Sequence, residues 1–210
     1  VYSMMVYNWP TGLLKKMNVF IKKFVWTGST IDKKLETIPW VTCCKPLDKG
    51  VLRIKNVKLF NDSLQAKMTW MLIHHNSDST AFLKNHFITK LMNGNRNYII
   101  SSIWTSIRLS FISIMHYSRW MVCTNSSMNF WLDNWIGVTL ISTLTYDTPP
   151  DNTNSTTRDF LLSHEITLPN YISYIIDNYP FSNTDDFLIW ESAFNGSIDS
   201  KSFYKKFHQF

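Results

Sequence analysis

Eight lysines in the first third of the chain form a series that could bind phosphate groups. They are Lys15, Lys16, Lys22, Lys23, Lys33, Lys34, Lys55 and Lys58. Ammonium groups in such a series neutralise nucleic-acid phosphates, and this electrostatic effect dominates affinity for the backbone. Residues 1–70 hold twelve Lys and Arg against four Asp and Glu, whereas residues 71–210 hold nine against eleven. The pattern predicts a nucleic-acid-binding surface, although a solvated helix face would have the same composition.

No group of residues in the sequence is typical of a metal site. Zinc needs about four Cys or His ligands in closely spaced pairs. We expect His74-His75 to end a helix, where a cation favours the C-terminal dipole, and the adjacent Cys43-Cys44 to provide one packing residue and one chance thiol. The candidates considered are Cys43-Cys44, His74-His75 and Cys123, and they supply neither a C-x₂₋₄-C nor an H-x₃₋₅-H pair.

Catalytic residues are not predicted either. Two-metal phosphoryl transfer needs two or three converging carboxylates, and the only Asp-Asp pair is Asp185-Asp186. It lies in a polar stretch, so we expect a solvated turn ahead of a strand. Neither a G-x-S-x-G nucleophile turn nor a Gly-rich phosphate loop occurs.

Four of the lysines lie on a predicted basic amphipathic helix over residues 11–26. Thr11 is a candidate N-cap, and Gly28 is a suitable stop signal. The helical spacing predicts one apolar face, with the lysines on the opposite side. The residues expected on that face are Leu13, Met17, Phe20 and Phe24.

The remaining apolar periodicity predicts a mainly helical chain with a small antiparallel element. Alternating residues at 119–123 and 128–132 predict a central β-hairpin, in which Trp120, Trp131 and Trp135 are either core residues or base-stacking residues. The fold class is therefore α+β, dominated by helix, with N-terminal amphipathic helices and a short C-terminal strand-turn-helix. The other elements expected are helices 57–74, 80–92 and 99–115, a linker at 147–159, a helical pattern at 158–179, a strand at 186–190, a turn at Asn195-Gly196 and a final helix from Ser200.

Six segments, in order, resemble the region downstream of the polymerase core in plant non-LTR (LINE-type) retrotransposon reverse transcriptases. The similarity covers nearly the whole chain. The segments are the basic helix after Trp9-Pro10; the linker residues Trp40, Cys44 and Pro46; Phe60-Asn61 with Ala66, Lys67 and Trp70; Ile103-Trp104 with Ile107; Trp120 with Phe130-Trp131-Leu132-Asp133-Asn134-Trp135; and Leu188-Ile189-Trp190 with Asn195-Gly196 and Ser202-Phe203-Tyr204.

The resemblance implies four segments of a retroelement polyprotein. They are a thumb-proximal basic helix at 1–28, a connector with helices and a Trp-rich hairpin at 29–146, a linker and helix at 147–182, and the start of a truncated zinc-binding region at 183–210. The family's aromatic-x-Asp-Asp catalytic turn is absent, since no aromatic residue stands two before Asp185. This chain is thus not expected to be an enzyme, whereas the parent would be an RNA-directed DNA polymerase that needs Mg²⁺.

The expected role is that of a connector that helps to hold RNA or an RNA–DNA hybrid. One alternative is an independent basic nucleic-acid-binding module, and another is a structural or protein-interaction domain. No apolar run approaches the length of a membrane span, and the first residues lack a charged leader and an initiator Met, so we expect a protein fragment. The three cysteines, of which Cys43 and Cys44 are adjacent, fit a reducing compartment, so we expect this fragment inside the cell, in the cytoplasm or the nucleus. Neither a cofactor nor a small-molecule ligand is predicted for this chain.

Overall fold

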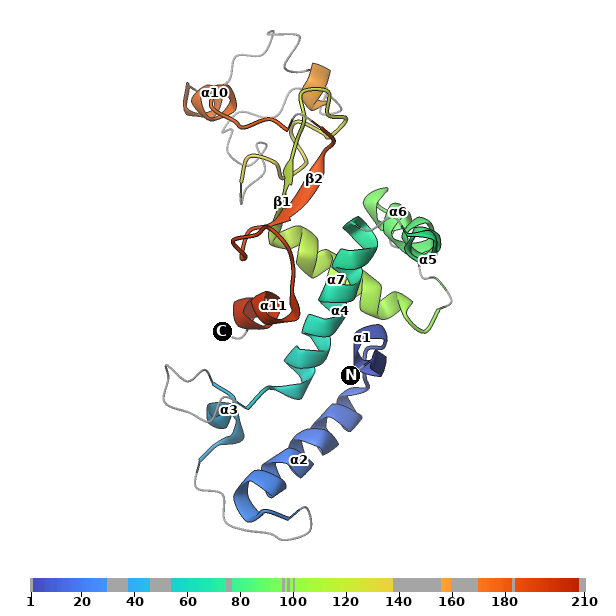
Figure 1. Cartoon of the computed structure of the whole chain (residues 1–210), viewed down its shortest axis with the longest axis vertical. Helices are drawn as coiled ribbons and strands as arrows, with labels where there is room; N and C mark the ends of the chain where they lie inside the picture. The colour runs from blue at the N-terminus through green and yellow to red at the C-terminus, as the bar shows by residue number, and fades with distance from the viewer. Residues whose placement is uncertain are drawn as a thin grey trace. The chain divides into compact units, whose positions relative to one another are not determined.

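The computed structural model describes the chain in two compact units (Figure 1). It describes residues 2–29, 38–45, 54–74, 77–95, 97, 99, 101–137, 156–159, 170–182 and 184–207. Unit 1 comprises residues 1–114 and 198–210, and unit 2 comprises residues 115–197. The mainly helical α+β class is confirmed. The four polyprotein segments stay a prediction, because such segments need not coincide with units of packing.

Unit 1 is built around one long helix, α4. The helices α1, α2, α5 and α11 and the π-helical turn η2 all contact α4. The predicted helix over 57–74 is confirmed to the residue. The bounds are α1 Tyr2–Val6, α2 Thr11–Thr27, α3 Trp40–Cys43, α4 Val57–His74, α5 Asp78–Leu83, η2 Lys84–Ile88, α6 Thr89–Met92, α7 Trp104–His116 (whose last two residues belong to unit 2) and α11 Ser200–Phe207.

The first residues of α4 are fixed by Asn56. Its side-chain Oδ1 accepts a hydrogen bond from the N–H of Leu59 at 3.1 Å, which satisfies a donor of the first helical turn. Its own N–H donates to the hydroxyl of Tyr204 on α11 at 2.8 Å. Burial raises the pKa of Tyr204, so the phenol stays neutral and keeps its proton. The two segments of unit 1's sequence, 1–114 and 198–210, are therefore joined at the start of α4.

The predicted helix over 11–26 is confirmed as α2, but of its expected apolar face only Met17 packs against the rest of unit 1. Leu14 is buried, and Met17 and Ile21 pack with it against α1 and α4. Phe20 and Phe24, expected in the core, are 55% and 61% exposed, and Leu13 is also exposed. A second apolar flank, formed by Leu14, Ile21 and Val25, adjoins the expected face in the sequence, and the position of α4 decides which flank is buried.

The ends of α2 agree only in part with expectation. Gly28 ends the helix with φ 71°, the left-handed conformation that favours glycine, and its N–H donates to the carbonyl of Phe24. Thr11, however, is the first helical residue instead of the N-cap, because Pro10 occupies the cap position with no side-chain hydrogen bond.

Two further helical predictions needed correction. The segment expected at 80–92 starts at Asp78 and contains the wide π turn η2, although it ends at Asn93-Gly94 as predicted. The helix expected at 99–115 starts at Trp104. Trp104 is buried, and its N–H donates to the carbonyl of Ser101 at 3.3 Å.

Unit 2 contains a two-stranded antiparallel sheet of β1 (Ser118–Met121) and β2 (Phe187–Trp190). The predicted strand at 186–190 is confirmed, but the predicted local partner of β1 was wrong. Residues 130–132 form a turn, in which the Asn129 Oδ1 accepts the N–H groups of Trp131 and Leu132 at 2.9 and 2.8 Å, and Asn129 itself forms an isolated antiparallel bridge with Thr156. Such side-chain bonds compete with strand pairing.

The core of unit 2 is aromatic. Phe130, Trp131 and Trp135 are buried with Ile172 and Ile176 of helix α10 (Asn170–Asp177), and Trp120 packs against them partly buried. The core interpretation of Trp131 and Trp135 is therefore confirmed. The helical pattern at 158–179 corresponds to α10 only in its last part; residues 160–169 lie outside the described residues.

The predicted linker at 147–159 lies outside the described residues up to residue 155. Its end is not a free linker, because Thr157 is buried. The Thr157 N–H donates to the carbonyl of Met128 at 2.8 Å, and its hydroxyl does so at 3.0 Å.

Helix α11 carries a reciprocal cap that gives a first prediction. The N–H of Ser202 donates to the Asp199 carboxylate, and the Asp199 N–H donates to the Ser202 hydroxyl at 3.2 Å. The hydrogen bond from Ser202 lowers the pKa of Asp199. Asp199→Ala is expected to lower the free energy of unfolding by about 1 kcal/mol, measured by urea denaturation at neutral pH.

Asp199→Asn is the matched control, because Asn caps as well as Asp but does not titrate. A carboxylate whose pKa is lower in the folded protein than in the unfolded protein stabilises the folded state at pH values above its unfolded pKa. This contribution is lost as the pH falls through its folded pKa. The wild type should therefore lose stability relative to Asp199→Asn below about pH 4. Equal stability of the Ala and Asn variants at pH 7 would contradict the capping role.

Candidate nucleic-acid interface

Helix α2 presents the four lysines as two ridges along its surface. Lys15 and Lys16 are exposed, whereas Lys22 and Lys23 are half-buried. Lys15 and Lys22 are seven residues apart, as are Lys16 and Lys23, so each pair spans about 10 Å along the axis. Because α2 contains no acidic residue, this helix has no carboxylate of its own to neutralise them.

Lys15 and Lys22 lie opposite the predicted apolar face, as expected, but Lys16 and Lys23 lie beside it. Lys16 is three residues after Leu13 and four before Phe20, and residues at these spacings are neighbours on a helix. Lys23 is likewise three residues after Phe20. One exposed side of α2 therefore combines ammonium groups with apolar side chains, whereas the flank of Leu14, Met17 and Ile21 faces the rest of unit 1.

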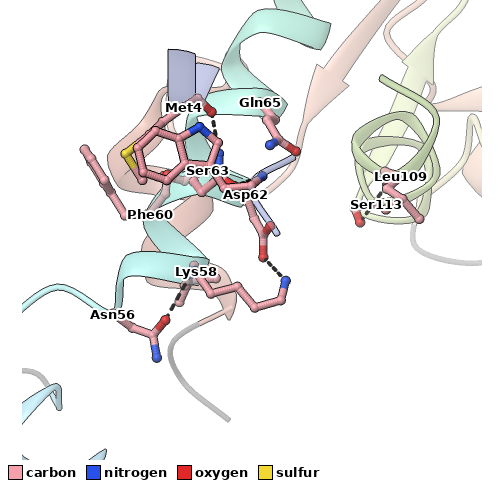
Figure 2. A network of polar contacts seen from close by, with 12 residues as sticks. Met4, Asn56, Lys58, Phe60, Asp62, Ser63, Gln65, Leu109 and Ser113 are labelled. Atoms are coloured by element: carbon pink, nitrogen blue, oxygen red, sulfur yellow. Dashed lines mark hydrogen bonds and ion pairs between the residues drawn. The ribbon is translucent and has the colours of Figure 1, made fainter. Parts of the chain in front are cut away.

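Lys55 and Lys58 lie at the start of α4 and each has a local partner. The Lys58 Nζ is 2.7 Å from the Asp62 Oδ2, one turn along the helix (Figure 2). The Lys55 Nζ lies 4.6 Å from the centroid of the Phe60 ring. Both lysines are exposed. An exposed i,i+4 ion pair such as Lys58–Asp62 contributes only about 0.3–0.5 kcal/mol to stability, so a phosphate would compete with Asp62 for Lys58. Lys33 and Lys34 lie outside the described residues.

Two buried amides hold the segment that leads into α2. The Asn61 Nδ2 donates to the carbonyl oxygens of Met4 and Tyr7, and its Oδ1 accepts the Trp9 N–H at 3.1 Å. The Gln65 Nε2 donates to the same Tyr7 carbonyl at 2.7 Å. Figure 2 shows Met4 and Gln65 with this stretch of α4. The entry to α2 is thus fixed by α4, which positions the lysine ridges within unit 1.

Sequence reasoning did not identify this role for Asn61 and Gln65. The sequence motifs include Asn61 without giving it a structural role, and they do not include Gln65. A weak signal was present, because both stand on the otherwise apolar side of the helix over 57–74, where a buried amide needs partners.

Asp186 belongs to a loop contact in unit 2. Its Oδ1 accepts the Cys123 N–H at 2.8 Å, and its Oδ2 accepts the Ser126 hydroxyl at 2.8 Å. The expectation of a solvated turn holds for the exposed Asp185 but was wrong for Asp186, which ties the loop after β1 to the start of β2. Burial raises the pKa of Cys123, and the neighbouring carboxylate adds to the effect, so its thiol is not activated.

The other Cys and His residues that were considered as metal ligands are buried or stacked on a ring wherever the structure describes them. Cys43 and Cys44 are buried, and burial raises the pKa of Cys44. His74 ends α4 and stacks on Trp70, with ring centroids 4.0 Å apart; His75 lies outside the described residues. Within the described ranges, no group of three or more His, Cys, Asp or Glu residues could hold a metal ion. In the same part of the chain, no helix has both the length and the apolarity to cross a membrane.

The chain is similar to two curated plant proteins. One, from Arabidopsis thaliana, is named "Putative ribonuclease H protein" and is 26% identical over 142 residues, which are 65% of this chain and 23% of that relative. Another from the same plant, named "Uncharacterized mitochondrial protein", is 27% identical over 146 residues, which are 65% of this chain and 91% of that relative. The chain thus spans less than a quarter of the first relative and about nine tenths of the second. No family model and no solved structure matches it.

Proposed function

We propose that this chain is a piece of a plant retroelement polyprotein and binds RNA or an RNA–DNA hybrid through α2. The observation that carries the proposal is a helix with four lysines and no acidic residue, held in place by buried hydrogen bonds from α4. The name of the first relative, a ribonuclease H protein, supports a connection with nucleic acid.

In this proposal the chain is a connector without catalysis of its own. The resemblance of its motifs to non-LTR reverse transcriptases implies that another part of the parent polyprotein, the palm of the polymerase, would bind Mg²⁺ and polymerise DNA. Residues 183–210 would be the lead-in to a zinc-binding region whose ligands are not among the residues of this chain.

The proposal is tested by the salt dependence of binding to an unstructured 20-nucleotide RNA and to an RNA–DNA hybrid. Replacing Lys15, Lys16, Lys22 and Lys23 by Gln, which preserves helix propensity, should weaken both complexes. On the single strand, the slope of log affinity against log salt should fall by about 0.7 for each phosphate that the variant no longer neutralises, hence by up to about three. Fluorescence anisotropy over roughly 50 to 200 mM salt, a range in which this relation predicts large changes of affinity, measures the slope.

The matched control removes the same charge from other helices. In it, Lys67 of α4 and Lys201, Lys205 and Lys206 of α11 become Gln. If binding is specific to α2, the control should keep most of the wild-type salt slope. Equal reductions in both variants would mean that net charge alone attracts the nucleic acid, and the α2 interface would then be wrong.

A protein-interaction role is the second candidate, and a specific observation favours it. Leu13, Phe20 and Phe24 are exposed on α2 instead of being buried. If the α2 lysine variant binds nucleic acid as the wild type does, whereas Phe20→Ser with Phe24→Ser abolishes association with a partner protein, this second role is the correct one.

A further inference from the structure

A second surface of unit 1 combines an exposed aromatic ring with positive charge. Phe82 on α5 is 69% exposed, although it lies in a helical run that also packs on α4 (Figure 1). We propose that Phe82, His86 and Lys90 form a stacking site for one unpaired base of a single-stranded nucleic acid. This inference deepens the proposed function and rests on it.

The outer ring is supported from below by a series of aromatic contacts. Phe82 and His86 are stacked, with centroids 5.8 Å apart and planes only 7° from parallel. His86 meets Phe87 edge-on at 4.6 Å, and Phe87 stacks on Trp104 at 5.8 Å. Phe87 and Trp104 are buried, so a series of ring–ring contacts connects the exposed Phe82 with the core of unit 1. A ring so held offers a flat face with little loss of side-chain freedom on binding.

The π-helical turn brings these side chains onto one face. Lys84–Ile88 form the turn η2, which lies between α5 and α6. Phe82, His86 and Lys90 follow one another at intervals of four residues, the spacing of neighbours on a helix surface. The sequence pattern was visible, but only the structure shows that Phe82 is exposed.

Charge identifies the occupant as a nucleic-acid strand. The helical run from Asp78 to Met92 contains two lysines, Lys84 and Lys90, against one acidic residue, Asp78 at its start, and Lys90 is exposed. A base stacked on Phe82 would bring its own phosphate within reach of such a cation, which an apolar protein partner would leave unpaired. In a duplex the faces of internal bases are already stacked, so the site is expected to select single strands.

The test compares a 12-nucleotide oligouridine with a 12-base-pair RNA duplex, using the full chain. Phe82→Ala should weaken binding of the single strand about tenfold, within the range measured for removal of one aromatic–base contact, and should leave duplex affinity within about twofold. Phe82→Trp should restore single-strand binding, because it retains a stacking face. Phe194→Ala is the matched control, since Phe194 is fully exposed on unit 2.

The outcomes separate the stacking site from the α2 interface. Removal of the α2 lysines should weaken single strand and duplex together, whereas removal of the Phe82 ring should weaken only the single strand. If Phe82→Ala and Phe194→Ala bind alike, or if Phe82→Ala weakens the duplex equally, the stacking site is wrong while the α2 interface stands. An effect of Phe82→Ala with none from the lysines would support stacking and reject the α2 interface.

Discussion

Trp135→Ala is expected to unfold most of unit 2. The Trp135 indole is 0% exposed and its Nε1 donates to the carbonyl of Phe130 at 3.0 Å. Its ring meets Tyr179 edge-on at 5.1 Å and lies 6.3 Å from Phe181. Removing a buried Trp side chain leaves a large cavity and typically costs about 3–5 kcal/mol. That cost is a large part of the stability of a small unit.

Hydrogen exchange followed by mass spectrometry measures this effect for each unit separately. In Trp135→Ala, backbone amides of β1, β2 and α10 should lose protection. Leu132→Ala is the matched control, because Leu132 is close to Trp135 in the sequence and 51% exposed, so its replacement should change the stability by less than about 0.5 kcal/mol. Equal protection in the two variants would show that the aromatic cluster does not stabilise unit 2.

Local sequence determined the helices well and the sheet poorly. The ranges of α2 and α4 followed from apolar spacing, because helical hydrogen bonds are made within the segment. The partner of β1 was missed because its register joins Ser118 to Trp190, far away in the sequence. The alternation at 128–132 suggested a nearer partner, but the side chain of Asn129 closes a turn there.

The candidate site was predictable in its residue types and not in its geometry. The lysines of α2 were evident from the sequence, yet the exposure of the neighbouring Leu13 and Phe20 depends on which flank meets α4. The pairing of Lys58 with Asp62 was predictable, because Asp62 stands at the i+4 position of the helix expected over 57–74. Exposure of Phe82 is likewise a tertiary property, since the same pattern on another helix would be core.

Asn61→Asp is expected to destabilise unit 1 by about 3 kcal/mol at pH 7, because it puts an acceptor oxygen against two carbonyl oxygens and buries a charge. Asn61 is 0% exposed, and its Nδ2 donates to the carbonyl oxygens of Met4 and Tyr7. Burial raises the folded pKa of the new carboxyl above its unfolded value. The destabilisation should therefore grow as the pH rises above about 4 and shrink on acidification, when a proton restores one donor.

Asp62→Asn, the reciprocal change at the next residue, is the matched control for Asn61→Asp. It removes only the exposed ion pair with Lys58 and should cost less than about 0.5 kcal/mol. Urea denaturation followed by circular dichroism, at acidic pH and at pH 7, distinguishes the two variants. If Asn61→Asp were as stable as Asp62→Asn at pH 7, then α4 would not hold the entry to α2, and the lysine ridges would lose the support on which the proposed interface depends.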